Sequence, residues 1–219
     1  MRLTIYGKNV VTKALVFTVM IDIIAILVPV FIVKLILLAV SVLLFGFVLY
    51  FFRDPVRTLP EGLKDNEIIS PADGKVMMIE EIEENTFLKS KAKLVGIFLS
   101  PLNVHVNRIP VSGKVEYCQH IKGGYIVAFD HKSSQRNERT EIGITNPKFK
   151  ILFKQIAGFV ARRIVCNLRA GTNVKQGEKF GMIKFGSRVD VIMPVNSVIR
   201  VSVNQRVTGG ETIIAEVPA

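Results

Sequence analysis

The dipeptide Gly186-Ser187, between two strand-like runs, has the residue types that peptide self-cleavage requires. Glycine tolerates a strained backbone, and without a Cβ atom it leaves its carbonyl carbon open to attack. The Ser187 hydroxyl can reach that carbonyl and displace the amide nitrogen, which converts the peptide bond into an ester. Such a hydroxyl needs a base, commonly a histidine that an acid orients. The same pair is also common in ordinary turns.

His105 and Asp73 are the candidate base and acid. His105 is one of three histidines, with His120 and His131, and it lies between valines in a strand-like run bounded by prolines. A histidine in such a place is often a buried structural residue, but imidazole titrates near neutral pH and can transfer protons. Asp73 precedes a glycine in SPADG, where an aspartate usually caps a turn. Both become interesting if they converge on Ser187.

The elements that must position these residues are short strands. From residue 53 onward, apolar runs alternate with Gly, Pro and Asn turns, which predicts a mostly β domain, a compact antiparallel sandwich or barrel. Two weak internal repeats, PADGKV with PVSGKV and VKQGE with VTGGE, indicate duplicated turn-strand motifs. The second repeat resembles biotinyl and lipoyl carrier domains, but the lysine that those carriers expose at a hairpin tip is not found in the expected setting.

A long apolar segment, residues 14–52, precedes this domain and holds only two charges, Asp22 and Lys34. As one helix it would be about 59 Å long, against a hydrocarbon core of roughly 30 Å. Pro29 near its middle predicts a break and therefore a helical membrane hairpin. The expected domains are a basic segment 1–13, the hairpin 14–52 and a catalytic domain 53–219.

Basic residues flank the hairpin on both sides, which predicts a membrane protein whose catalytic domain faces the cytoplasm. They are Arg2, Lys8 and Lys13 before it and Arg53, Arg57 and Lys64 after it. The net charge of +11 fits an anionic membrane surface. Nucleic acid is the competing partner for a basic protein, but no nucleic-acid motif is present, so none is expected.

Two cysteines, Cys118 and Cys166, lie far apart without CxxC spacing. This argues against a disulfide scaffold and against a zinc site, and no metal is expected. We expect buried free thiols.

Four motifs in order carry a family resemblance: SPADGKV, FLSPLNVHVNRIPVSGKV, HKSSQRNER and GEKFGMIKFGSRVDV, after a hairpin that ends in FFRDPVR. Together they resemble the short archaeal and bacterial form of the phosphatidylserine decarboxylases, over essentially the whole chain. Archaetidylserine decarboxylases share this form and are an alternative. A noncatalytic membrane-anchored β-sandwich adaptor or carrier, and a serine hydrolase, are the alternatives from other classes.

The resemblance implies a zymogen that cuts itself between Gly186 and Ser187 into a β chain, 1–186, and an α chain, 187–219. Ser187 then becomes a covalent pyruvoyl cofactor, which forms a Schiff base with phosphatidylserine and decarboxylates it to phosphatidylethanolamine. Asp73 and His105 fall on the family's acid and histidine positions. Longer bacterial members have a second histidine where this chain has Arg108.

That difference leaves open whether His105 serves both self-cleavage and decarboxylation or whether His120 or His131 assists; we favour His105 for both. The HKSSQRNER segment supplies candidate substrate-binding residues, which are Lys132, Arg136, Asn137 and Arg139. The family resemblance also implies a homo-oligomer.

Overall fold

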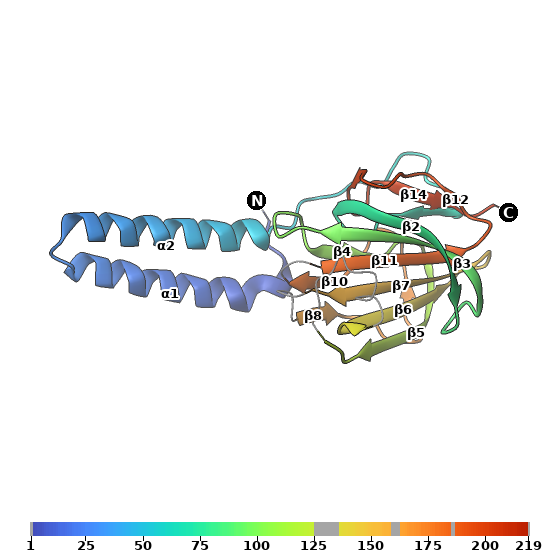
Figure 1. Cartoon of the computed structure of the whole chain (residues 1–219), viewed down its shortest axis with the longest axis horizontal. Coiled ribbons are helices and arrows are strands. Elements are labelled where there is room, and N and C mark those ends of the chain that lie inside the picture. Colours follow the sequence, from blue (N-terminus) through green and yellow to red (C-terminus); the bar gives the residue numbers. More distant parts are fainter. Residues whose placement is uncertain (1, 125–135, 159–162, 185–186, 219) are drawn as a thin grey trace. The chain divides into compact units, whose positions relative to one another are not determined.

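The computed structural model describes residues 2–124, 136–158, 163–184 and 187–218. They form two compact units, Met1–Pro55 and Val56–Ala219 (Figure 1). The elements of the first unit are η1 (Ile5–Gly7), α1 (Lys8–Leu27) and α2 (Phe31–Phe51). Those of the second are β1 (Glu67–Ile69), β2 (Gly74–Glu84), β3 (Ser90–Leu99), β4 (Val106–Arg108), β5 (Gly113–Ile121), β6 (Arg139–Thr145), β7 (Lys150–Ala157), β8 (Arg163–Cys166), β9 (Asn173–Val174), β10 (Lys179–Lys184), β11 (Ser187–Pro194), β12 (Val198–Ile199), β13 (Arg206–Val207) and β14 (Ile213–Glu216).

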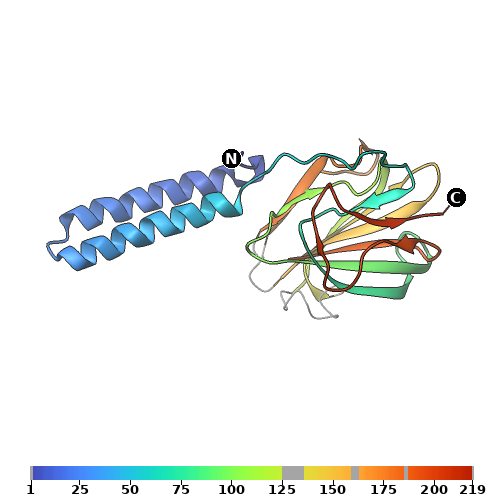
Figure 2. The ribbon, with the colours of Figure 1, turned by 90° about the horizontal axis from the view of Figure 1, so that it is seen from above.

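The first unit is a pair of apolar helices that lie side by side (Figures 1 and 2). The chain leaves the helical conformation between Leu27 and Phe31, at the proline that predicted the break. One hydrogen bond, from Ser41 Oγ to the Thr18 carbonyl at 3.3 Å, joins the two helices. Most of their large apolar side chains are exposed. Each helix is long and apolar enough to cross a membrane.

An eight-stranded antiparallel sheet forms the centre of the second unit, in the order β13-β2-β3-β11-β7-β6-β5-β9. Strand β11 is paired with β3 along its whole length and with β7 from Ser187 to Ile192. Its side chains alternate between faces: Val189, Val191 and Met193 enter the main core. Ile192 belongs to a smaller apolar cluster on the opposite face, as the two-residue period of a strand requires.

Two three-stranded sheets, β4-β10-β8 and β1-β14-β12, complete the second unit. The main core takes side chains from all three sheets, among them Val189 of the large sheet, Phe180 of β10 and Ile214 of β14. The fold class predicted from the sequence, a mostly β domain after an apolar helical hairpin, is confirmed.

The duplicated sequence motifs recur as duplicated structure. Gly74 and Gly113 each begin a strand so close to a neighbouring carbonyl that a Cβ atom would lie 2.3 Å and 2.4 Å from it. Each strand then has a register shift at the same distance from its glycine, after Val76 in β2 and after Val115 in β5. These matched irregularities account for the first repeat.

Candidate active site

Ser187 is the first residue of β11, in the interior of the large sheet. It lies opposite Leu99 at the end of β3 and opposite Ala157 at the end of β7. Its side chain is fully buried, and its Oγ atom has no hydrogen-bond partner among the residues that the structure describes. A buried hydroxyl in this condition costs free energy and commonly marks a functional position. Gly186 lies outside the described residues.

His105 belongs to the same end of the large sheet as Ser187. Two contacts, one at each end of the segment 99–105, place it there. Leu99, which begins the segment leading to His105, lies opposite Ser187. At the other end, the Ile183 N–H donates to the His105 carbonyl at 3.4 Å, which extends the pairing of β4 with β10. The segment 99–105 thus begins opposite Ser187 and ends beside Ile183. His105, like Ser187, is fully buried.

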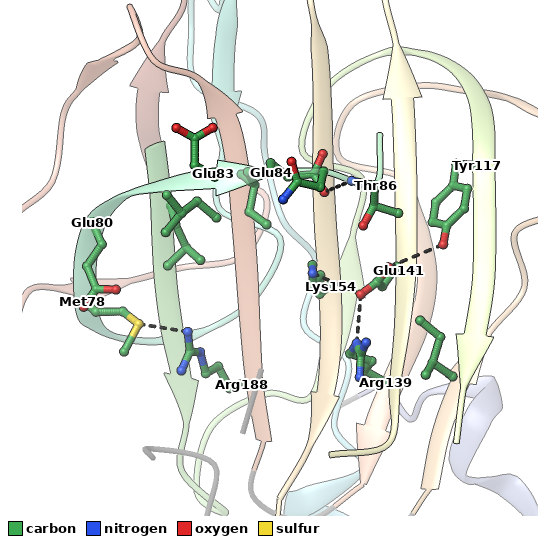
Figure 3. Close-up of a pocket in the computed structure, with 15 residues that line it drawn as sticks. Met78, Glu80, Glu83, Glu84, Thr86, Tyr117, Arg139, Glu141, Lys154 and Arg188 are labelled. Atoms are coloured by element: carbon green, nitrogen blue, oxygen red, sulfur yellow. Dashed lines mark hydrogen bonds and ion pairs between the residues drawn. The ribbon is translucent and has the colours of Figure 1, made fainter. Parts of the chain in front are cut away.

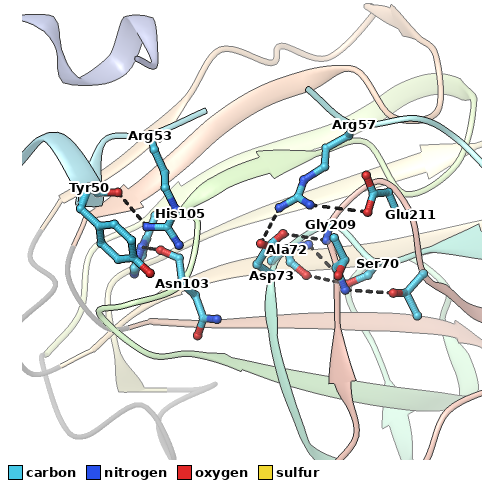
Figure 4. A network of polar contacts seen from close by, with 12 residues as sticks. Tyr50, Arg53, Arg57, Ser70, Ala72, Asp73, Asn103, His105, Gly209 and Glu211 are labelled. Carbon is cyan, nitrogen blue, oxygen red and sulfur yellow. Dashed lines mark hydrogen bonds and ion pairs between the residues drawn. The ribbon is translucent and has the colours of Figure 1, made fainter. Parts of the chain in front are cut away.

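The imidazole of His105 is oriented by backbone. Its Nδ1 atom lies 2.9 Å from the Asn103 carbonyl oxygen. Figure 4 marks this contact with a dashed line. Because a carbonyl oxygen can only accept a hydrogen bond, the neutral ring carries its proton on Nδ1 and its lone pair on Nε2. The Asn103 side chain in turn accepts from the Ser100 N–H at 2.9 Å and shapes this turn. At Nδ1 the orienting group is thus Asn103, whereas the sequence analysis assigned that role to Asp73.

Asp73 lies directly before β2, whose first residues pair with the end of β3, so it belongs to the same end of the sheet as Ser187. One carboxylate oxygen binds the Arg57 guanidinium at 2.6 Å, and the other accepts from the Gly209 N–H at 2.9 Å (Figure 4). Arg57 also reaches Glu211 at 3.5 Å. These contacts fasten the beginning of β2 to the turn after β13.

Sequence reasoning missed a pair of buried amides, Asn107 and Gln155. The Gln155 Nε2 atom donates to Asn107 Oδ1 at 2.8 Å, and neither side chain is exposed to solvent. Gln155 lies opposite Val189 and two residues before Ala157, so it projects to the same face as Ser187. In the described part of the chain, Asn107 Nδ2 and Gln155 Oε1 have no further partner. The one available signal was Gln155 itself, a polar residue in an apolar strand.

The candidate substrate-binding residues have different environments. Lys132 lies outside the described residues, and Arg136 is exposed. Asn137 is buried, and its Nδ2 atom donates to the Ala157 carbonyl at 2.7 Å, which ties it to the strand residue opposite Ser187. Arg139 is mostly buried and binds Glu141 at 2.8 Å. Burial opposes ionisation of Glu141, but the hydrogen bonds from Arg139 and Lys154 hold its pKa below the ordinary value.

Arg108, at the position of the second histidine of longer relatives, donates to the Gly177 carbonyl at 3.0 Å and is nearly buried. Its guanidinium stem packs against Gly210, where a Cβ atom would lie 2.8 Å from Arg108 Cδ. The residue thus contacts the glycines of the two V-x-x-G-E turns.

A polar cavity of about 470 Å³ lies on the face of the large sheet that carries the Arg188 side chain (Figure 3). Arg188 enters it fully buried, paired with Asp190 at 2.5 Å and 2.8 Å from the Met78 sulfur. Glu141, Lys154 and Arg139 line another part of it. Successive residues of a strand point to opposite faces, so this cavity does not receive Ser187.

A buried serine at the start of a central strand, and a buried histidine in the segment that follows the neighbouring strand, are the candidate nucleophile and base of a mostly β enzyme. The phosphatidylserine decarboxylase family model matches residues 44–215. The chain is 45% identical to the phosphatidylserine decarboxylase proenzyme of Prosthecochloris aestuarii, over 97% of this chain and 96% of that protein. It is 50% identical to the proenzyme of Chlorobium limicola over 80% of this chain and 81% of that one. The proenzyme of Salinibacter ruber is 46% identical over 79% and 77%.

The chain belongs to the phosphatidylserine decarboxylase family. It is therefore an enzyme of the decarboxylase class, as the motifs predicted.

Proposed function

We propose that this chain is a proenzyme that cuts itself between Gly186 and Ser187, converts Ser187 into a pyruvoyl group and decarboxylates phosphatidylserine to phosphatidylethanolamine. The observation that carries the proposal is the buried Ser187 Oγ, without a hydrogen-bond partner among the described residues, at the first position of β11. The family match and the proenzyme names of the relatives support it.

In the proposed self-cleavage, Ser187 Oγ gives its proton to His105 Nε2 and attacks the Gly186 carbonyl carbon. The bond from that carbon to the Ser187 nitrogen breaks, the nitrogen takes up a proton, and an ester remains. Elimination then releases the Gly186 carboxylate, and hydrolysis with loss of ammonia leaves a ketone at the start of the α chain. The protonation pattern set by Asn103 supports this assignment, because it leaves the lone pair on Nε2.

The site suits a pyruvoyl group, because the new terminus would be held in place on both sides. Residue 187 is paired with β3 and with β7, so the cut falls just outside a strand that stays in its sheet. A pyruvoyl group supplies the electron sink that loss of carbon dioxide requires. We assign Asn107 and Gln155 the role of positioning residues for it, with the spare N–H of Asn107 as a donor to a developing negative charge.

The proposed function also requires residues that bind the lipid head group and a segment that holds the domain at the membrane. Arg136 is exposed and is our candidate contact for the phosphodiester, with Lys132 as a second. The apolar helices would hold the domain at the bilayer and so raise the local concentration of lipid. We propose that the β unit faces the cytoplasm. Arg53 and Lys64, which follow the apolar helices, are the flanking cations that support this orientation. Arg57 contributes less, because Asp73 and Glu211 bind it.

Mass spectrometry of the purified chain tests self-cleavage. We expect two fragments, 1–186 and 187–219, with the smaller one blocked at its N-terminus and reactive toward hydroxylamine, in place of the 24.4 kDa precursor. Ser187→Ala should remain uncut. Ser197→Ala is the matched control, since Ser197 is also fully buried but binds the Pro194 carbonyl at 2.7 Å. A Ser187→Ala protein that splits normally would refute the assignment.

Decarboxylation is tested separately with phosphatidylserine in detergent micelles, by measuring carbon dioxide release. We expect His105→Ala to lose both the cut and the reaction. Full carbon dioxide release by that variant would remove His105 from the mechanism.

A further inference from the structure

Cys118 and Cys166 are distant in sequence but neighbours in the folded chain. Cys118 belongs to β5 of the large sheet, and Cys166 ends β8 of the β4-β10-β8 sheet. Cys118 Sγ donates to the Leu168 carbonyl, two residues beyond Cys166, at 3.5 Å. Both cysteines line a surface cavity of about 420 Å³, and neither is in a disulfide. They are half-buried, more accessible than the buried thiols that the sequence predicted.

The two thiols also differ in acidity because they contact each other. A hydrogen bond with Cys166 lowers the pKa of Cys118 to about 7, against the opposing effect of burial. The same contact, together with burial, raises the pKa of Cys166. The contact therefore favours the thiolate of Cys118 over that of Cys166, and the thiolate is the form of cysteine that attacks other sulfur atoms.

We infer that Cys118 and Cys166 form a redox-active dithiol, which small-molecule disulfides oxidise to an intramolecular disulfide. The Cys118 thiolate attacks one sulfur of the reagent, forms a mixed disulfide and releases one thiolate. Cys166 then loses its proton and attacks the Cys118 sulfur, which releases the second thiolate. Two protein thiols are oxidised and one reagent disulfide is reduced, so the electrons balance.

Oxidation is favoured over metal binding by the surroundings of the pair. Within residues 2–124, 136–158, 163–184 and 187–218, no group of three or more His, Cys, Asp or Glu side chains could hold a metal ion. His120, which lines the same cavity, contacts Thr140 at 3.2 Å and Glu138 at 3.5 Å through its two ring nitrogens. Among these described residues, the pair thus offers two sulfur ligands without a third ligand of these types.

The disulfide would connect two sheets that the backbone joins elsewhere. Cys166 lies opposite Gly181 of β10, and β10 runs on toward Ser187. The disulfide would therefore link β8 to β5 of the large sheet. Strand β8 pairs with β10, the strand that precedes the proposed cleavage site.

The test uses the whole protein in detergent, treated with oxidised glutathione at neutral pH. We expect an intact mass lower by two hydrogen atoms, a cross-linked peptide containing Cys118 and Cys166, and full reversal by dithiothreitol. Stable addition of glutathione without a cross-link, or the absence of any reaction, would overturn the inference.

Single substitutions and limited alkylation separate the two steps. Cys118→Ala and Cys166→Ala each remove the contact that makes the two acidities differ, and each should stop at a mixed disulfide with one glutathione. In the unsubstituted protein, limited alkylation with iodoacetamide at pH 7 should modify Cys118 before Cys166, and faster modification of Cys166 would contradict the assigned order. The inference is independent of the proposed function, because uncut Ser187→Ala protein should form the same disulfide.

Discussion

Gln155 donates a 2.8 Å hydrogen bond to Asn107 across the interior of the β unit, between two side chains that solvent does not reach. The bond links β7, which holds Ser187 in the sheet, to β4, which follows His105. The amide pair thus connects the two strands that set the geometry of the candidate nucleophile and base.

Gln155→Leu should slow self-cleavage about tenfold or more, because it leaves the Asn107 carbonyl buried without its donor. The loss of one such bond costs about 1–3 kcal/mol, and about 1.4 kcal/mol corresponds to a tenfold change in rate. The fraction of cut chain against time after synthesis measures it. Gln119→Leu, at an exposed position of β5, is the control. A lower melting temperature with an unchanged rate of cutting would show that the pair is only structural.

Asn137 and Arg136 are adjacent in the same motif but should have different roles. Asn137→Ala removes the bond to the Ala157 carbonyl opposite Ser187 and should reduce the yield of cut protein and its stability. Arg136→Ala removes an exposed cation and should raise KM for phosphatidylserine severalfold while kcat stays the same, since it acts in binding. Measurements of KM and kcat on micelles, together with the yield of cut protein, distinguish the two roles. A raised KM in Asn137→Ala and a reduced yield of cut protein in Arg136→Ala would contradict the assignment.

Glu141 should make stability depend on pH. Its folded pKa lies below the ordinary value of 4.5, so its ion pairs stabilise the fold above about pH 4.5, and this contribution is lost as the pH falls through the lowered pKa. Lys154→Met breaks the 3.0 Å ion pair with Glu141 and should lower the melting temperature by a few degrees at pH 7. At pH 3, the difference in melting temperature between Lys154→Met and the unsubstituted protein should be smaller than at pH 7.

Lys150→Met is the control for this comparison. Lys150 lies on the same strand but is half-exposed and 3.9 Å from its acidic neighbour, so its loss should have little effect at either pH. A Lys154→Met difference that is equally large at pH 3 would contradict the assignment to Glu141 ionisation.

The two fragments should remain together after the cut. The α chain contributes β11 to the interior of the large sheet, and it contributes β13 and β14, which pair with β2 and β1. Gel filtration under native conditions should therefore give one species, and a denaturant should be needed to separate it. Free α chain under native conditions would contradict this.

Sequence alone predicted the elements that follow local rules. The hairpin followed from a long apolar run with Pro29, and the strands followed from turn residues at regular intervals. The repeat of PADGKV in PVSGKV predicted that two strands would begin alike, but it did not predict the register shifts after Val76 and Val115. The predicted features depend on residues close together along the chain, where periodicity and turn chemistry are informative.

Contacts between distant segments were not predictable in this way. Asn103, two residues from His105, binds it through a carbonyl group, which no side-chain pattern reveals. Arg57 was taken for a membrane-flanking cation but binds Asp73. Two further contacts depend on which strands become neighbours in the fold. They are the contact of Cys118 with the segment that holds Cys166 and the hydrogen bond of Gln155 to Asn107.

Strands β1 and β2 near the beginning of the β unit take their partners from β14 and β13 near its end. A ribosome that has just produced Ser187 has not yet made those partners, and the last residues of a nascent chain are still inside the exit tunnel. The sheets around Ser187 can therefore be completed only after β13 and β14 have been synthesised and have left the ribosome. In the proposed mechanism, each polypeptide would therefore form its reactive group once, after these strands have paired.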